Sequence, residues 1–138
     1  MPSTYNKFYS FVGGLVNGVY NLSSDTIKIM LSNTAPSASN VNTADITQIS
    51  GTNGYTTNGT AVGSFTVVDS SGTVTASGNS VVFTAATGAM GPLRYAVLYD
   101  ATVASQNLIA WWDYGSSISP NVGETFTVSF PSNIFTLS

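Results

Sequence analysis

The chain has 138 residues, of which 43% are hydrophobic and only 7% are charged, and its formal net charge is −3. This length suits a single domain with an adequate core, and the hydrophobic content argues against a disordered chain. Three basic residues are too few for a nucleic-acid surface, which needs several lysine or arginine contacts to phosphates. Because the chain has no cysteine and no histidine, disulfides, the usual zinc sites and histidine general bases are excluded.

The polar residues are mostly Ser, Thr and Asn, a composition common in extracellular and virion β proteins. No stretch approaches the ~20 apolar residues of a membrane span. The N-terminus has neither the basic start nor the continuous apolar run of a signal peptide. We therefore expect no membrane partner and synthesis in a cytoplasm.

One helix is expected near the N-terminus, over about residues 4–17. Apolar side chains recur there at spacings of three and four residues: Phe8, Phe11, Val12, Leu15, Val16 and Val19. Ser3 or Thr4 is suited to cap the helix. Glycines at three positions weaken it, so packing must hold it in place. The simpler interpretation is a helix that closes one end of the core, and the alternative is a free arm that reaches a partner.

Short extended segments separated by turns fill the rest of the chain. The segments expected as strands are residues 27–31, a run around 65–67, 73–77, 81–85, 94–99, 108–114, 125–130 and 134–137. Residues 44–49 form a short strand or a turn. About eight strands at spacings of about 8–12 residues indicate an all-β fold. We expect one antiparallel β-sandwich domain over residues 1–138, with a barrel or a jelly roll as compatible topologies.

Two short turns are expected to join consecutive strands. Residues 70–72 (SSG) turn the chain between the strand around 65–67 and the strand at 73–77. Gly78 and Asn79 form a recognised two-residue hairpin connection, which predicts that the strands at 73–77 and 81–85 pair directly.

The segment 93–115 holds both tryptophans, the only arginine and three tyrosines. Its two runs of strand-forming residues flank a polar loop, ATVASQN, so an antiparallel hairpin is expected. In the second run Ile109, Trp111 and Asp113 point to one face and Ala110, Trp112 and Tyr114 to the other. One indole therefore fills the core, and the other is covered by a second layer, a neighbouring subunit or a ligand.

The acidic residues give no catalytic set. A glycosidase needs two carboxylates that face each other at about 5–9.5 Å, and only Asp113 lies among aromatic residues. Asp25, Asp69 and Asp100 sit at turns or strand ends, where aspartate closes the turn. The acids are not spaced as in a calcium loop. We therefore expect no enzyme, no cofactor and no metal site.

The aromatic residues leave three uses open: core packing, contact with another protein, and stacking on sugars. Arg94 and Asp113 lie on the two arms of the expected hairpin, where a cross-strand ion pair is possible, and the arginine is equally suited to an interface. Tyr55 is the one aromatic residue of the glycine-rich loop 51–59. The candidate interface residues are Trp112, Tyr114, Tyr95, Tyr99, Arg94, Asp113 and Tyr55.

Several longer phrases resemble a family of small structural proteins of tailed bacteriophages. The resemblance is most specific in SDTIKIMLSNTAP and LIAWWDYGSS, extends through NGYTTNGT and MGPLRYAVLYD, and is weak over residues 61–87. We associate this family with capsid cement or decoration proteins. The resemblance therefore implies a virion protein that is made in the host bacterial cytoplasm. Its partner would be the outer surface of the major capsid protein lattice. The resemblance favours a trimer, and it implies no active-site residues in this chain. The alternative is a tail-fibre or receptor-binding module that binds host polysaccharide.

Overall fold

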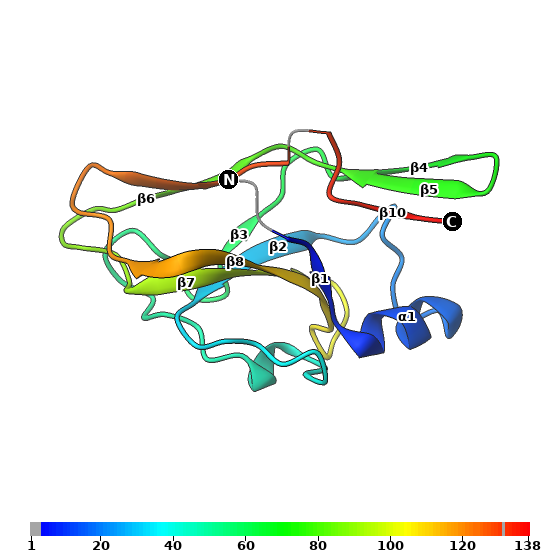
Figure 1. The fold of residues 1–138 in the computed structure, drawn as a ribbon, viewed down its shortest axis with the longest axis horizontal. Coiled ribbons are helices and arrows are strands. Elements are labelled where there is room, and N and C mark those ends of the chain that lie inside the picture. The colour runs from blue at the N-terminus through cyan, green and yellow to red at the C-terminus, as the bar shows by residue number, and fades with distance from the viewer. Residues whose placement is uncertain (1–3, 131) are drawn as a thin grey trace.

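Figure 1 shows the computed structural model of the chain, in which residues 4–130 and 132–138 are described. These residues form antiparallel sheets and one short α-helix, so the predicted β-rich fold is confirmed. The strands come from the segments with β-branched and aromatic residues, which suit a pleated and half-buried surface.

The largest sheet has five strands in the order β1-β8-β7-β2-β3. These strands are β1 (Asn6–Lys7), β8 (Leu108–Ile118), β7 (Leu93–Asp100), β2 (Ile27–Ser32) and β3 (Thr60–Ala61). All four neighbouring pairs are antiparallel. The predicted hairpin of the central segment is therefore present, and it supplies the middle strand β7 and its neighbour β8.

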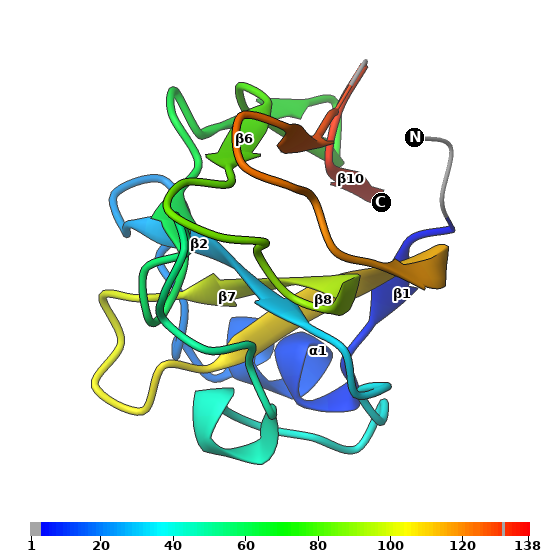
Figure 2. The same ribbon diagram turned by 90° about the vertical axis from the view of Figure 1, so that its left-hand side faces the viewer.

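Two smaller antiparallel sheets lie over one face of this sheet (Figures 1 and 2). One contains β10 (Phe135–Leu137), β5 (Thr73–Ser77) and β4 (Thr66–Ser70), and the other pairs β6 (Val81–Thr84) with β9 (Thr125–Val128). The main hydrophobic core fills the space between the layers. It includes Ile29, Leu98, Phe83, Phe126 and Trp112.

The opposite face of the large sheet carries a second, smaller core of Phe8, Met30, Ile46, Val97, Tyr99 and Leu108. Phe8 and the segment that follows β2, with the short 3₁₀ helix η1 (Thr43–Asp45), cover this face (Figure 1). Helix α1 (Tyr9–Val16) lies at the same side, and its Phe11 reaches the main core. The large sheet is thus covered on both faces.

The two tryptophans lie on opposite faces of β8, as predicted. Trp112 belongs to the main core, and Trp111 packs on the ring of Phe8 at 4.6 Å between centroids. Trp112 is buried within the chain, whereas Trp111 is only partly buried, under Phe8. The prediction for Ile109 is wrong, because a register shift between Leu98 and Tyr99 interrupts the alternation and places Ile109 in the main core beside Ala110.

The helix starts later than predicted. Asn6 and Lys7 pair with β8 as β1, and these backbone hydrogen bonds keep the chain extended until Phe8. Phe8 precedes the helix without a side-chain cap, so Thr4 does not cap it, and Ser3 lies outside the described residues. The apolar stripe is also divided, because Phe8 and Phe11 are buried whereas Val12, Val16 and Val19 are exposed.

The predicted turn at Ser70–Gly72 is present, with Ser70 opposite Thr73. The hairpin predicted at Gly78 and Asn79 is wrong, because β5 pairs with β4 and β10 while β6 pairs with β9. A Cβ atom at Gly78 would lie 2.5 Å from the Val62 side chain, so this glycine permits close packing. Residues 44–49 are chiefly a turn, with one bridge between Ser32 and Gln48.

We expect Phe8→Ala to lower the free energy of unfolding by about 3–5 kcal/mol, because it removes a fully buried ring from the second core. Urea denaturation followed by far-ultraviolet circular dichroism measures the loss. Tryptophan emission should shift to longer wavelength as Trp111 loses its cover. Val68→Ala on the exposed side of β4 is the control and should change stability by about 0.5 kcal/mol or less. Equal losses in the two variants would contradict the two-core arrangement.

Candidate functional site

The pairing of β7 with β8 brings Arg94 and Asp113 together, so the predicted ion pair is confirmed. Arg94 donates from Nε to Asp113 Oδ1 at 2.8 Å and from Nη2 to Oδ2 at 3.1 Å. The guanidinium also lies over the Tyr95 ring, 5.4 Å from its centroid. The hydrogen bond from Arg94 lowers the pKa of Asp113, and the backbone N–H of Gly115 adds to this effect.

This ion pair lies at the surface, since both side chains are more than a third exposed. Solvent screens such pairs, so their contribution to folding is small. The bidentate geometry instead fixes two opposite charges in a neutral unit. Tyr114 is also exposed, but it points to the other face of β8, where its ring packs against Phe126. These three residues (Arg94, Asp113 and Tyr114) are the predicted candidates that a neighbouring molecule is able to touch.

The other four predicted candidates are buried within the chain: Trp112, Tyr95, Tyr99 and Tyr55. The Tyr99 hydroxyl donates to the carbonyl of Asn58. The Tyr55 hydroxyl donates to Gln48 Oε1 at 2.9 Å and accepts a hydrogen bond from the Leu31 N–H at 3.2 Å. Tyr99 and Tyr55 therefore hold loops on the sheet, and none of the four buried rings offers a flat face to a ligand.

An exposed apolar surface on α1 was not among the predicted candidates. Val16 is 83% exposed and Tyr9 is 71% exposed, and Val12 and Val19 are exposed as well. Tyr9, Val12 and Val16 share one helix face because their spacing is three and four residues. We call Tyr9, Val12 and Val16 the α1 patch; Val19 lies beyond the end of the helix. The N-terminal segment has more apolar residues than one buried helix face needs. This excess is the feature of the sequence from which the patch could have been predicted.

The two glycines of α1 have different surroundings. A Cβ atom at Gly14 would lie 2.4 Å from the Tyr20 ring, so Gly14 allows the helix to pack closely on the body of the protein. A Cβ atom at Gly13 would meet nothing within 4 Å. No residue of α1 is charged. The outer side of the helix therefore exposes apolar side chains and carries no charge.

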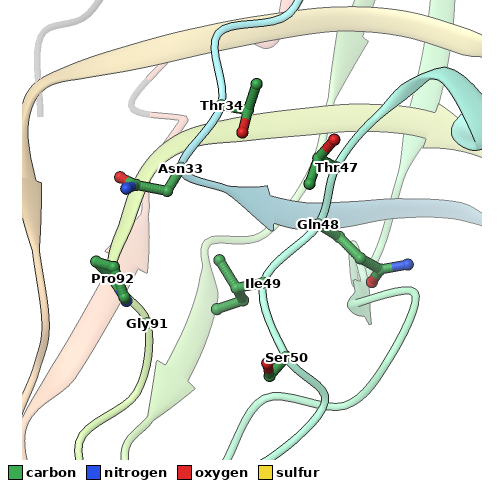
Figure 3. A pocket seen from close by; sticks show the side chains of 8 residues that line it. All are labelled: Asn33, Thr34, Thr47, Gln48, Ile49, Ser50, Gly91 and Pro92. Carbon is green, nitrogen blue, oxygen red and sulfur yellow. The ribbon is translucent and has the colours of Figure 1, made fainter.

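A surface pocket of about 230 Å³ lies between the end of β2 and the start of β7 (Figure 3). Its lining consists of Asn33, Thr34, Thr47, Gln48, Ile49, Ser50, Gly91 and Pro92. The Gln48 amide is turned away from the other side chains and bonds to Tyr55 and Asn58. Since the polar groups do not converge, the pocket lacks the arrangement that orients a small ligand.

Comparisons with protein-family models, curated proteins and solved structures each found no match to this chain. Over the part of the chain that the structure describes, no helix is long and apolar enough to cross a membrane.

Burial raises the pKa of four tyrosines to about 12, namely Tyr5, Tyr20, Tyr55 and Tyr99. A folded pKa above the ordinary value of 10.0 means that stability is intact below pH 10 and is lost as the pH rises towards 12. We expect ultraviolet titration to show a late ionisation phase that coincides with unfolding by circular dichroism.

Tyr99→Phe should reduce the amplitude of this late phase, because it removes one of the buried phenols. Ionisation of Tyr99 while the circular dichroism signal is still native would contradict its place in the core.

Proposed function

We propose that the chain is a capsid cement or decoration protein of a tailed bacteriophage, which binds the outer surface of the major capsid protein lattice and stabilises the shell. The α1 patch is the observation that carries this proposal. The resemblance of the sequence to small phage structural proteins supplies the class of partner.

An apolar helix face without charged residues is unusual at the surface of a chain that acts alone. It suits an apolar surface on a folded partner, because no ion has to lose its water when the two surfaces meet. The rest of the surface is rich in Ser, Thr and Asn, which supply hydrogen bonds at the rim of such a contact.

The proposed mechanism is adhesive. A protein that bridges neighbouring capsid subunits binds the assembled lattice and not its separate subunits. Mass action then stabilises the assembled form in proportion to occupancy. This mechanism requires an exposed binding face and a stable body, and it requires no reactive group.

We also propose that the layers form a β-sandwich with jelly-roll-like connections. The pairs β7–β8, β6–β9 and β5–β10 are nested in the sequence, each pair enclosing the previous one. Such nesting arises when a long hairpin folds over itself, which is how jelly rolls are connected. The main core between the large sheet and the two smaller sheets supports the sandwich.

The proposal includes a homo-oligomer, with a trimer implied by the resemblance. Arg94, Asp113 and Tyr114 are the exposed candidates for the contact between copies. The alternative, a sugar-binding tail-fibre module, needs flat exposed rings. Its support is weaker because Trp112, Tyr95 and Tyr99 are buried.

We expect the purified protein to co-sediment with expanded empty capsids at stoichiometric occupancy. Val16→Asp should weaken this binding by about tenfold or more, since it places a charge in the apolar contact. Val122→Asp is the matched control, because Val122 is 62% exposed but lies between β8 and β9, outside the α1 patch.

Failure of the unsubstituted protein to bind any capsid form would contradict the proposed function. Binding that is equally sensitive to both substitutions would contradict the role of the α1 patch. Saturable binding on a glycan array would favour the sugar-binding alternative.

A further inference from the structure

The dipeptide Asn-Gly occurs at three places in the chain, residues 17–18, 53–54 and 58–59. This dipeptide is chemically labile, because the nitrogen of a glycine, which no side chain shields, is able to attack the side-chain carbonyl carbon of the asparagine before it. The attack requires both residues to move out of their folded positions. The surroundings of each pair therefore decide whether it reacts in the folded protein.

The second pair is held on both sides. Asn53 Nδ2 donates to the Ala89 carbonyl at 3.0 Å, and Asn53 Oδ1 accepts from Thr87 Oγ1 at 3.2 Å. A Cβ atom at Gly54 would overlap the Thr84 carbonyl, so this glycine lies tight against the backbone of β6. The asparagine amide cannot swing towards the Gly54 nitrogen without the loss of both hydrogen bonds.

The third pair is held by its backbone as well as by its side chain. Asn58 Oδ1 accepts from Gln48 Nε2 at 3.2 Å, the Asn58 N–H donates to Gln48 Oε1 at 2.7 Å, and the Asn58 carbonyl accepts from the Tyr99 hydroxyl. Gly59 is buried, and its N–H donates to the Thr56 carbonyl at 2.8 Å. The attack would need all of these contacts to open together.

The first pair lies at the end of α1 and is the least restrained. The Asn17 side chain is exposed, and among the described residues no hydrogen bond holds its amide. A Cβ atom at Gly18 would meet nothing within 4 Å, so this glycine lies in open space. The Gly18 N–H makes one long hydrogen bond, to the Leu15 carbonyl at 3.3 Å.

The last turn of α1 is also easy to open. The helix has only 8 residues, two of them glycine, and no side-chain cap at its start. Such a short helix has little stability of its own, so packing decides which part of it stays folded. Packing against Tyr20 holds Phe11 and Gly14, whereas Val16 and Asn17 are exposed. The last turn therefore opens without disturbing the core.

We propose that Asn17 is a modification site, at which the folded protein loses its side-chain amide while Asn53 and Asn58 keep theirs. The Gly18 nitrogen forms a bond to Asn17 Cγ and the Cγ–Nδ2 bond breaks. The amide nitrogen leaves as ammonia, and its third proton comes from the Gly18 N–H. Water then opens the five-membered imide at one of its two carbonyl carbons, which leaves aspartate or isoaspartate. Water is the only co-reactant.

Either product changes the end of the helix. A negative charge appears next to Val16 of the α1 patch, at the C-terminal end of the helix, where the helix dipole disfavours it. Isoaspartate also lengthens the backbone. This disturbs the hydrogen bonds by which the N–H groups of Gly18 and Val19 close the last turn. The reaction thus alters the α1 patch with time, and it requires no partner protein.

Incubation of the purified full chain at mildly alkaline pH, followed by peptide mass spectrometry, tests this site. Trypsin separates the first pair, in residues 8–28, from the other two, in residues 29–94, and tandem spectra assign the conversion to each asparagine. We expect Asn17 to convert at least about tenfold faster than Asn53 or Asn58. This ratio corresponds to a difference of about 1.4 kcal/mol in the free energy of local opening.

The control for local sequence is the same chain unfolded in guanidinium chloride, in which the three rates should become similar. Asn17→Gln keeps a neutral amide and should abolish the conversion in residues 8–28 without changing the other two sites. Gln48→Ala removes the hydrogen bonds that hold Asn58, so it should speed the conversion of Asn58 and leave that of Asn17 unchanged.

The proposal is overturned if Asn53 or Asn58 converts as fast as Asn17 in the folded protein. It is equally overturned if Asn17 stays intact in the folded protein over a period in which the unfolded chain reacts.

Discussion

Strand β7 is buried on both faces, and the rest of the structure follows from the need to cover it. Its side chains alternate between the main core, which contains Leu98, and the second core, which contains Val97 and Tyr99. A strand of this kind is stable only between two layers, because each exposed face would leave apolar area in water. The two smaller sheets supply one layer. Phe8 and the segment after β2 supply the other.

Local pattern was sufficient to predict the elements around β7 and insufficient to predict how the outer strands pair. The β7–β8 hairpin and the Arg94–Asp113 pair follow from alternation along neighbouring segments of the chain. The pairing of β5 with β10 and of β6 with β9 joins residues that are 41 to 63 positions apart. A favourable turn sequence at Gly78 does not decide such long-range pairing. The position of Ile109 was also beyond prediction, since one bulge reverses every face assignment on one side of it.

The candidate surface was predicted less well than the fold. Composition shows that a strand is rich in aromatic residues, but burial depends on the layers above and below it, so Tyr55 and Tyr99 became core residues. The α1 patch arises from tertiary placement, because the fold buries Phe8 and Phe11 and leaves Val12 and Val16 outside.

Tyr20 supports the helix that carries the α1 patch. Its ring packs on Phe11 at 5.1 Å and against Gly14, and so holds α1 on the body of the protein. Its hydroxyl donates to the Leu108 carbonyl at 2.7 Å, which ties the ring to β8. A helix held in this way presents the α1 patch in one fixed orientation, which reduces the conformational entropy lost on binding.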